Sequence, residues 1–184
     1  MDKIRRLDLA DANIVAGGNA YDGNNRTSDN TIGYIMFRYM NFEELILPKT
    51  VTKIDNASLS WCTALSKIIW PENLSVIGGE AFAYCNNLSE IAIPESVNTI
   101  GFCAFLNCPI ETITIPKNVQ RIEYTAFGQC SKLIEIHIKA LPSTLTSIGS
   151  TLADYEKVTV YVPMGTKEEY YLTELGNFKT IIEE

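Results

Sequence analysis

The sequence predicts a solenoid, in which short similar coils of chain stack along one axis around a shared apolar core. Two observations predict it: several rows of residues recur with one period, and a short alternating apolar run precedes the prolines. The proline row is Pro48, Pro71, Pro94 and Pro116, and the isoleucine row is Ile32, Ile54, Ile77, Ile100 and Ile122. The phenylalanine row is Phe37, Leu59, Phe82, Phe105 and Phe127, and the cysteine row is Met40, Cys62, Cys85, Cys108 and Cys130. Because every interval in these four rows is 22 or 23 residues, the chain consists of repeated structural units.

Each unit begins with an expected strand, of which Leu88-x-x-Ile91-x-Ile93 is an example. Side chains alternate between the two faces of a strand, so the isoleucines are expected to point into the core. Pro94 ends the strand because it lacks the N–H that a ladder needs. One unit cannot bury its apolar side alone, so successive units are expected to stack and pair their strands in a parallel β-sheet on one face.

The rest of each unit is expected to turn and return along the other face. A glycine row follows the isoleucines and predicts a turn with positive φ. It holds Gly33, Gly78, Gly101 and Gly149, and it is interrupted by Asp55 and Glu123. The Ala104-Phe105-x-x-Cys108 segment predicts a short turn or half-helix that places its phenylalanine and cysteine in the core. Trp70 aligns with the inward Ile93 and is expected to be buried.

The repeated pattern Leu-x-x-Ile-x-Ile-Pro-x-x-Val-x-x-Ile-Gly-x-x-Ala-Phe-x-x-Cys resembles the BspA-type leucine-rich repeat, also called the Treponema pallidum type. The resemblance extends from about Ile32 to Ile138. It implies a right-handed leucine-rich-repeat solenoid. It also implies a non-catalytic bacterial protein at the cell surface or secreted, since some members of the family are adhesins.

We expect a single domain over residues 1–184, divided into three parts. Residues 1–31 form an N-terminal strand and a polar loop, residues 32–139 form five regular repeats, and residues 140–184 form a degenerate repeat and a C-terminal cap. The cap is expected to contain a helix, because Thr166-Lys-Glu-Glu169 matches a capping box and Gly176 suits a helix C-terminus. Phe178–Ile182 is expected to form a final strand.

Composition excludes several classes of function. The net charge of −7, with 15 Lys and Arg against 22 Asp and Glu, argues against a nucleic-acid partner. The sequence contains no run of 18 apolar residues, so we expect no membrane insertion. The sequence has no nucleophile elbow, P-loop, dinucleotide motif or metal-binding motif, so we expect no enzyme activity, cofactor or metal. Four of the five cysteines share one inward row and are expected to be buried thiols.

Candidate binding residues lie in two outward rows of the strand face and one stripe on the return side. The candidates from the first outward row are Glu44, Lys67, Glu90 and Glu135, and those from the second are Ile46, Ile69 and His137. The stripe consists of Tyr39, Trp61 and Tyr84, which precede the cysteine row by one residue. Exposed aliphatic and aromatic side chains among charges are typical of interfaces.

The expected function is non-catalytic recognition of a protein or glycan on host or neighbouring cells, as in adhesion. Two alternatives remain: an intracellular or periplasmic assembly scaffold, and a carbohydrate-binding accessory module that uses the aromatic stripe. Met1–Asp11 carries basic residues without the apolar segment of a secretory signal. The sequence therefore leaves open whether the protein stays inside the cell or is exported.

Overall fold

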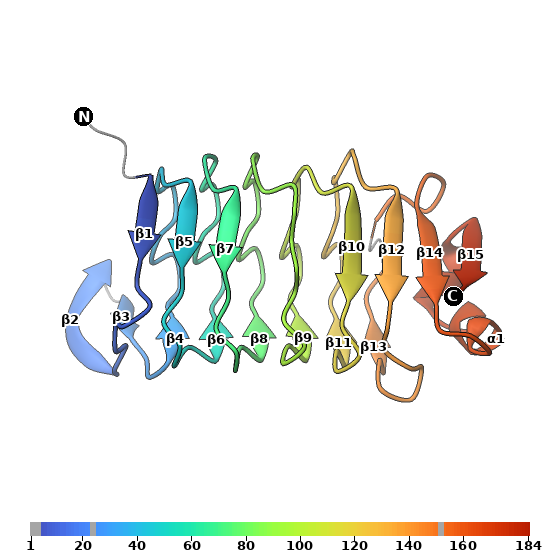
Figure 1. Ribbon diagram of the computed structural model, residues 1–184, viewed down its shortest axis with the longest axis horizontal. Coiled ribbons are helices and arrows are strands. Elements are labelled where there is room, and N and C mark those ends of the chain that lie inside the picture. The colour runs from blue at the N-terminus through green and yellow to red at the C-terminus, as the bar shows by residue number, and fades with distance from the viewer. Residues whose placement is uncertain (1–4, 23–24, 151–152) are drawn as a thin grey trace.

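The computed structural model describes residues 5–22, 25–150 and 153–184, and it confirms the solenoid. About seven turns of chain stack along the long axis of the molecule, with β1 near one end and β15 at the other (Figure 1). Strands dominate and helix is scarce, as the repeats predict.

The strand face carries the expected parallel strands, but they form two sheets instead of one. The first sheet is β1 (Arg6–Asp8), β5 (Glu44–Ile46) and β7 (Lys67–Ile69); the second is β10 (Thr112–Ile115), β12 (Glu135–Ile138), β14 (Thr159–Val162) and β15 (Thr180–Glu183). The expectation of a strand at Leu88–Ile93 is wrong, because this segment follows the same path without pairing to either side (Figure 1).

Trp70 lies on the β7 side of the break between the two sheets. It occupies an inward position that holds Leu47, Ile115 and Ile138 in other coils, and its indole packs edge-on against Phe82 at 5.5 Å between ring centroids. An indole is much larger than an aliphatic side chain, so we infer that Trp70 keeps the following coil away from β7; the gap toward β10 lies on the other side of that coil. The expectation that Trp70 is buried holds only in part, because the side chain packs against the core but is partly exposed.

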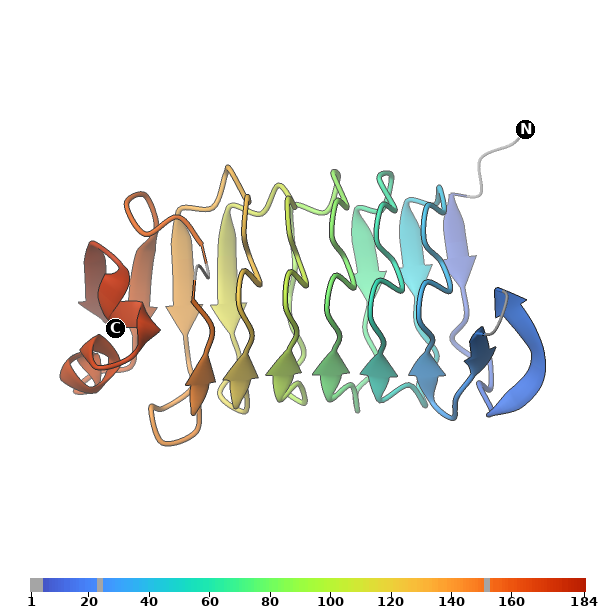
Figure 2. The ribbon, with the colours of Figure 1, turned by 180° about the vertical axis from the view of Figure 1, so that it is seen from behind.

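A second parallel sheet runs along another side of the solenoid, where only turns were expected. Its six two-residue strands are β4 (Thr31–Ile32), β6 (Lys53–Ile54), β8 (Val76–Ile77), β9 (Thr99–Ile100), β11 (Arg121–Ile122) and β13 (Ser147–Ile148). Figure 2 shows them side by side along one edge of the molecule. Each strand ends on the isoleucine row, whose first five members are completely buried.

The glycine row serves close packing instead of positive φ, which corrects the expectation from the sequence. Positive φ occurs in the described chain only at Gly17 and Gly165 among the glycines. A Cβ added to Gly101 would lie 2.5 Å from the backbone N of Gly79, and one added to Gly78 would lie 2.7 Å from the carbonyl carbon of Asp55. Glycine is therefore needed because the backbones of neighbouring coils touch at this turn.

The return side consists of turns built on residues in the left-handed region, without helix. Ten non-glycine residues with φ between 50° and 64° form two rows. The rows are Ile35, Ala57, Glu80, Cys103 and Thr125, and Tyr39, Trp61, Tyr84, Asn107 and Gln129. In each of the first four coils, alternate amides of the return donate to carbonyls of the next coil, as Leu59 N does to Ala81 O at 2.9 Å.

The core follows the predicted rows. Phe82, Phe105 and Phe127 are fully buried and stack face to face, with centroids 5.4 and 5.6 Å apart. The row is incomplete at the N-terminal end, where Met40 is 48% exposed and Phe37 only partly buried. The expectation that Met40 lies in the core is wrong, because no full repeat covers the outer side of the first coil.

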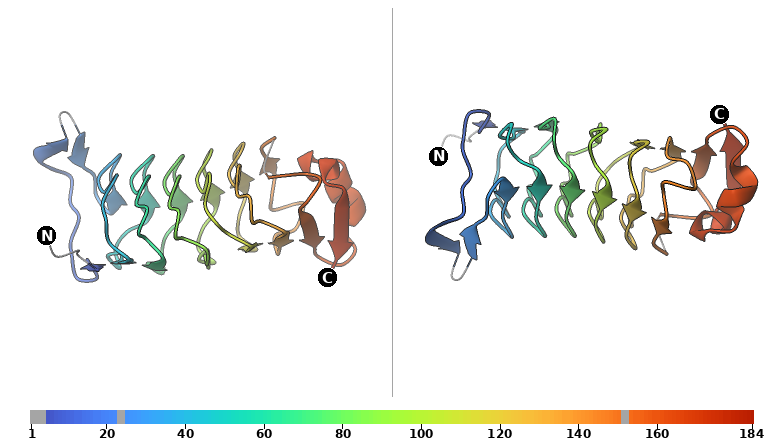
Figure 3. Two further views of the ribbon diagram at one scale, coloured as in Figure 1. Left: turned by 90° about the horizontal axis from the view of Figure 1, so that it is seen from above. Right: turned by 90° about the horizontal axis from the view of Figure 1, so that it is seen from below.

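The two ends are closed by different elements (Figure 3). At the N-terminal end, β2 (Gly17–Asp22) and β3 (Asn25–Thr27) form an antiparallel hairpin. At the C-terminal end, β14 pairs with β15, beside helix α1 (Lys167–Tyr171) and the 3₁₀ helix η1 (Glu174–Asn177). Tyr170 anchors this cap, because it is fully buried and its hydroxyl donates to the carbonyl of Ala140 at 2.7 Å.

The cap helix begins where the sequence predicts but is not closed by a capping box. Thr166 Oγ1 donates to the carbonyl of Pro163 and leaves the helix amides without a side-chain cap from Thr166. The amide of Lys167 instead donates to Glu183 Oε1 of the last strand at 3.0 Å. Gly176 lies inside η1 and does not end α1.

Candidate recognition surface on the strand face

The strand register places the two outward rows side by side as predicted. Glu44 lies opposite Lys67 and Arg6, and Ile46 lies opposite Ile69. Lys67 Nζ lies 2.7 Å from Glu44 Oε1, and Arg6 Nε lies 3.7 Å from Glu44 Oε2. The hydrogen bond from Lys67 is the largest cause that lowers the pKa of Glu44 below its usual value. This end of the first row is therefore a ladder of alternating charges.

The second outward row presents a small apolar patch beside these charges. Ile69 is 41% exposed and Ile46 is half-buried. Asp8 lies opposite Ile46 on the other side, so the patch ends at a carboxylate. An apolar surface of this size with a charged rim is a contact point and not a large interface.

A cleft of about 650 Å³ opens where the sheet breaks, and it extends from β7 across residues 89–92 to Glu111 and Thr112. Its floor is apolar and includes Ile68, Trp70 and Ile91, all partly exposed, whereas the corresponding Ile113 and Ile136 are buried. Its rim is polar and includes Lys67, Glu90, Glu111, Ser66, Ser89 and Thr112. The volume lies within the usual range of ligand sites. Sequence reasoning missed this cleft, although the tryptophan in an aliphatic row was its signal.

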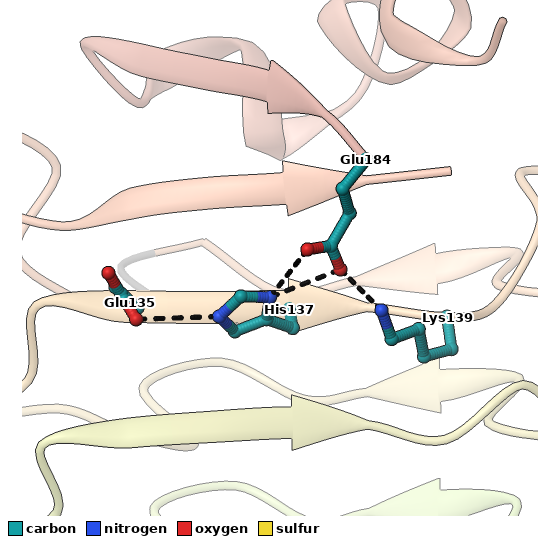
Figure 4. Close-up of polar contacts among 4 residues, drawn as sticks. All are labelled: Glu135, His137, Lys139 and Glu184. Atoms are coloured by element: carbon teal, nitrogen blue, oxygen red, sulfur yellow. Dashed lines mark hydrogen bonds and ion pairs between the residues drawn. The ribbon is translucent and has the colours of Figure 1, made fainter. Parts of the chain in front are cut away.

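Glu135 and His137 lie beyond the cleft, in a separate cluster on β12 (Figure 4). The His137 ring stacks on Tyr161 with centroids 4.4 Å apart. Its Nδ1 lies 3.0 Å from Glu184 Oε2, and its Nε2 lies 3.4 Å from Glu135 Oε2. Lys139 also pairs with Glu184. The cluster joins β12 to the end of the last strand, and sequence reasoning missed Lys139 and Glu184.

This cluster predicts a dependence of stability on pH. The hydrogen bond from Lys139 is the largest cause that lowers the pKa of Glu184, and His137 adds to it. Because the folded pKa lies below the unfolded value, the contribution is present at neutral pH and is lost as pH falls through the folded pKa. Glu184→Gln should lower the free energy of unfolding by up to about 1 kcal/mol at pH 7.

The measurement is urea unfolding of the wild type and of Glu184→Gln across pH 3–7. The difference between the two proteins should shrink as the pH falls below about 4. Glu168→Gln on the exposed side of α1 is the matched control and should change stability little. A difference that stayed constant over this range would contradict the role of the Glu184 carboxylate.

The aromatic stripe does not belong to the strand face, because it lies on the return side. Trp61 and Tyr84 stack with centroids 4.2 Å apart, and Tyr39 lies 6.2 Å from Trp61 at a tilt of 36°. The guanidinium of Arg38 covers Tyr39 at 4.8 Å. The face of Trp61 is thus occupied by Tyr84, and the face of Tyr39 is covered by Arg38. This geometry suits stabilisation of left-handed turns more than a flat platform for a sugar ring.

The cysteines behave as buried groups with one hydrogen bond each. Cys62, Cys85, Cys108 and Cys130 donate their thiols to the carbonyl of the phenylalanine-row residue in the preceding coil, at 3.0–3.3 Å. Burial raises the pKa of the Cys62 thiol to about 12 and that of Cys130 to about 11. Among the described residues no group of three His, Cys, Asp or Glu side chains could hold a metal ion.

The exposure of the thiols predicts their reactivity. In the native protein at neutral pH, a maleimide should label Cys103 alone, and slowly, because Cys103 is partly exposed and the four row cysteines are buried and protonated.

The substitution Cys85→Ser tests the buried row by its effect on stability. Cys85→Ser should lower the free energy of unfolding by about 1–2 kcal/mol, since a buried hydroxyl replaces the thiol but keeps the Leu59 carbonyl as acceptor. Rapid native labelling of the row, or an unchanged Cys85→Ser protein, would contradict the buried row.

Stacked parallel coils with an exposed strand face and buried isoleucine, phenylalanine and cysteine rows define a leucine-rich-repeat solenoid. The family model described as the BspA type leucine rich repeat region matches residues 54–159 in six copies. The chain belongs to this family, which together with the solenoid fold is typically non-catalytic. No curated protein sequence matches the chain. In the described part of the chain no helix is long and apolar enough to cross a membrane.

Solved structures of bacterial leucine-rich repeat proteins share this fold. The pneumococcal vaccine antigen PcpA is 24% identical with a TM-score of 0.62, and the match covers 78% of this chain and 42% of the antigen. The T. pallidum leucine-rich repeat protein is 22% identical with a TM-score of 0.61, over 77% of this chain and 71% of that protein. A leucine-rich repeat protein from Bacteroides ovatus is 17% identical with a TM-score of 0.56, over 98% and 63%. The chain thus spans less than half of the pneumococcal antigen.

Proposed function

We propose that the chain is a non-catalytic recognition module of a bacterial cell-surface or secreted protein, and that it binds a protein partner through its strand face. The observation that carries the proposal is the cleft at the break in the sheet. It joins an exposed apolar floor to a charged rim, next to the Ile46 and Ile69 patch. Buried apolar area with a polar rim is the usual composition of a recognition site.

Family and fold support the location outside the cell. The chain belongs to the BspA-type repeats, and the pneumococcal relative in fold is named a vaccine antigen. An assembly scaffold inside the cell is the competing function, since solenoids of this kind also join other chains. The stacked geometry of Tyr39, Trp61 and Tyr84 favours a structural role for the stripe, so a glycan-binding function receives less support.

The test is protease accessibility on intact native cells, with an antibody against this domain as the probe. Loss of the antibody signal while a cytoplasmic marker survives supports an external recognition module. Full protection that is lost only on lysis contradicts it and favours the scaffold, whose partners would then be sought by co-purification.

Recognition through the strand face needs a separate measurement once a partner is known. Ile69→Glu should weaken binding, because it places a charge in the apolar patch. Tyr171→Glu, at a partly exposed aromatic of the C-terminal cap, is the matched control and should bind as the wild type does. Equal loss in both variants would contradict the strand face as the binding surface.

A further inference from the structure

We propose that the cleft beside β7 binds an extended segment of the partner protein, which pairs with the free edge of β7 and carries apolar and basic side chains in alternation. This inference rests on the proposed function and names the chemistry of the partner at the same site. Three independent features carry it: unpaired backbone, an apolar floor and uncompensated carboxylates.

The backbone at the break has hydrogen-bonding groups that no described residue satisfies. β7 pairs only with β5, and β10 pairs only with β12. No described group bonds to the backbone N–H or C=O groups of residues 90–93, whereas Lys139 N of a later coil donates to Ile115 O at 2.9 Å. Unpaired ladder groups along an exposed strand edge are the template on which an extended peptide adds as a further strand.

The apolar floor of the cleft favours an apolar side chain of the partner segment. Ile68 and Ile91 lie in the inward row and are partly exposed only because the strands are splayed, and Trp70 lies beside them. A strand added along β7 directs alternate side chains inward, toward this floor. An aliphatic side chain of the partner would cover the apolar surface of this floor, which is exposed to water here but buried in the regular coils.

The negative charge of the rim favours basic side chains of the partner segment, between its apolar ones. Lys67 is already paired with Glu44 at 2.7 Å. Glu90 and Glu111, by contrast, form no ion pair with the described residues, although both line the cleft. The outward residues of an added strand would face these carboxylates, so lysine or arginine fits there.

The substitution Trp70→Ile provides the direct test, because it gives this coil the type of residue that the paired coils carry. Hydrogen–deuterium exchange should show fast exchange at the amides of residues 90–93 in the wild type and slow exchange at 112–115. In Trp70→Ile, residues 90–93 should gain protection as the sheet closes. Equal protection of the two segments in the wild type would contradict the break and the proposal with it.

Binding is tested with a phage-displayed library of random short peptides, selected on the wild type. Selected peptides should alternate apolar and basic residues, slow exchange at residues 90–93, and bind Trp70→Ile at least about tenfold more weakly. Trp61→Tyr changes the other tryptophan of the chain, on the return side, and is the matched control. Binding that survives Trp70→Ile unchanged would overturn the proposal.

A second variant keeps the test independent of any effect of Trp70→Ile on folding. Glu90→Gln combined with Glu111→Gln should weaken the peptides about two- to fivefold and reduce the salt dependence of binding. Glu168→Gln should do neither. If the peptides bind less tightly to Ile69→Glu but equally well to the Trp70, Glu90 and Glu111 variants, this inference alone is overturned. Protection of the domain from protease on intact cells would instead overturn only the proposed external function.

Discussion

Phe105→Ala is expected to lower the free energy of unfolding by about 3–5 kcal/mol. Phe105 is completely buried in a middle coil and is stacked between Phe82 and Phe127, with interplanar angles of 5° and 2°. Alanine removes the ring and leaves a cavity that both neighbours border. Backbone bonds to the next coil hold the return in place, so we expect the cavity to collapse only in part.

The measurement is urea unfolding followed by circular dichroism. Phe102→Ala is the matched control three residues away. Phe102 is only partly buried and stacks on Tyr124 at 5.6 Å, so its loss should cost clearly less. Similar losses in the two variants would contradict the register in which the phenylalanine row fills the core.

Gly101→Ala should be almost as damaging, at about 3 kcal/mol, the upper end of the usual cost of overpacking. The new Cβ would lie 2.5 Å from Gly79 N and 2.6 Å from the carbonyl carbon of Gly78. Both atoms are backbone, so the clash cannot be relieved by rotating a side chain. The two coils would have to separate, which weakens the bond from Gly101 N to Ile77 O at 2.8 Å.

Thermal unfolding of Gly101→Ala, with Asp55→Ala as the control, measures this effect. Asp55 occupies the same row and already carries a Cβ, so its replacement creates no clash and removes only the partly exposed ion pair with Lys53 and the hydrogen bond from Asn56 N at 2.9 Å. A Gly101→Ala protein as stable as Asp55→Ala would show that coil spacing does not demand glycine at this turn.

Periodicity predicted the stacking and, apart from Met40 and Trp70, the core rows, because these depend on local alternation and on one repeat length. Features that depend on contact between coils were not predictable in the same way. A glycine in a sequence can permit either a positive φ or the close approach of another backbone. Only the position of the neighbouring Gly79 backbone shows that close approach is the reason at Gly101. Tyr39 and Trp61 carry no local signal for left-handed turns, since the turns are held by bonds to the next coil.

The cleft illustrates a different limit. Trp70 fits an apolar row by hydrophobicity, and its consequence arises only from its size against Phe82 and the following coil. The cap shows the same dependence on distant residues. Glu183, which accepts from the first amide of α1, lies 16 residues beyond it in the sequence. Likewise Glu184, which follows β15, reaches His137 and Lys139 across β14, a contact that no short motif encodes.

The return side has one more property, which is electrical. Alternate amides of the first four returns point to the following coil and their acceptor carbonyls point back, so these peptide dipoles add along the solenoid instead of cancelling. The return side therefore has a negative end at its first coil and a positive end toward the C-terminal cap. The guanidinium of Arg38 lies at that negative end, over Tyr39. The sign of the field at a charged group near either end is therefore set by the direction in which the coils hydrogen-bond to one another.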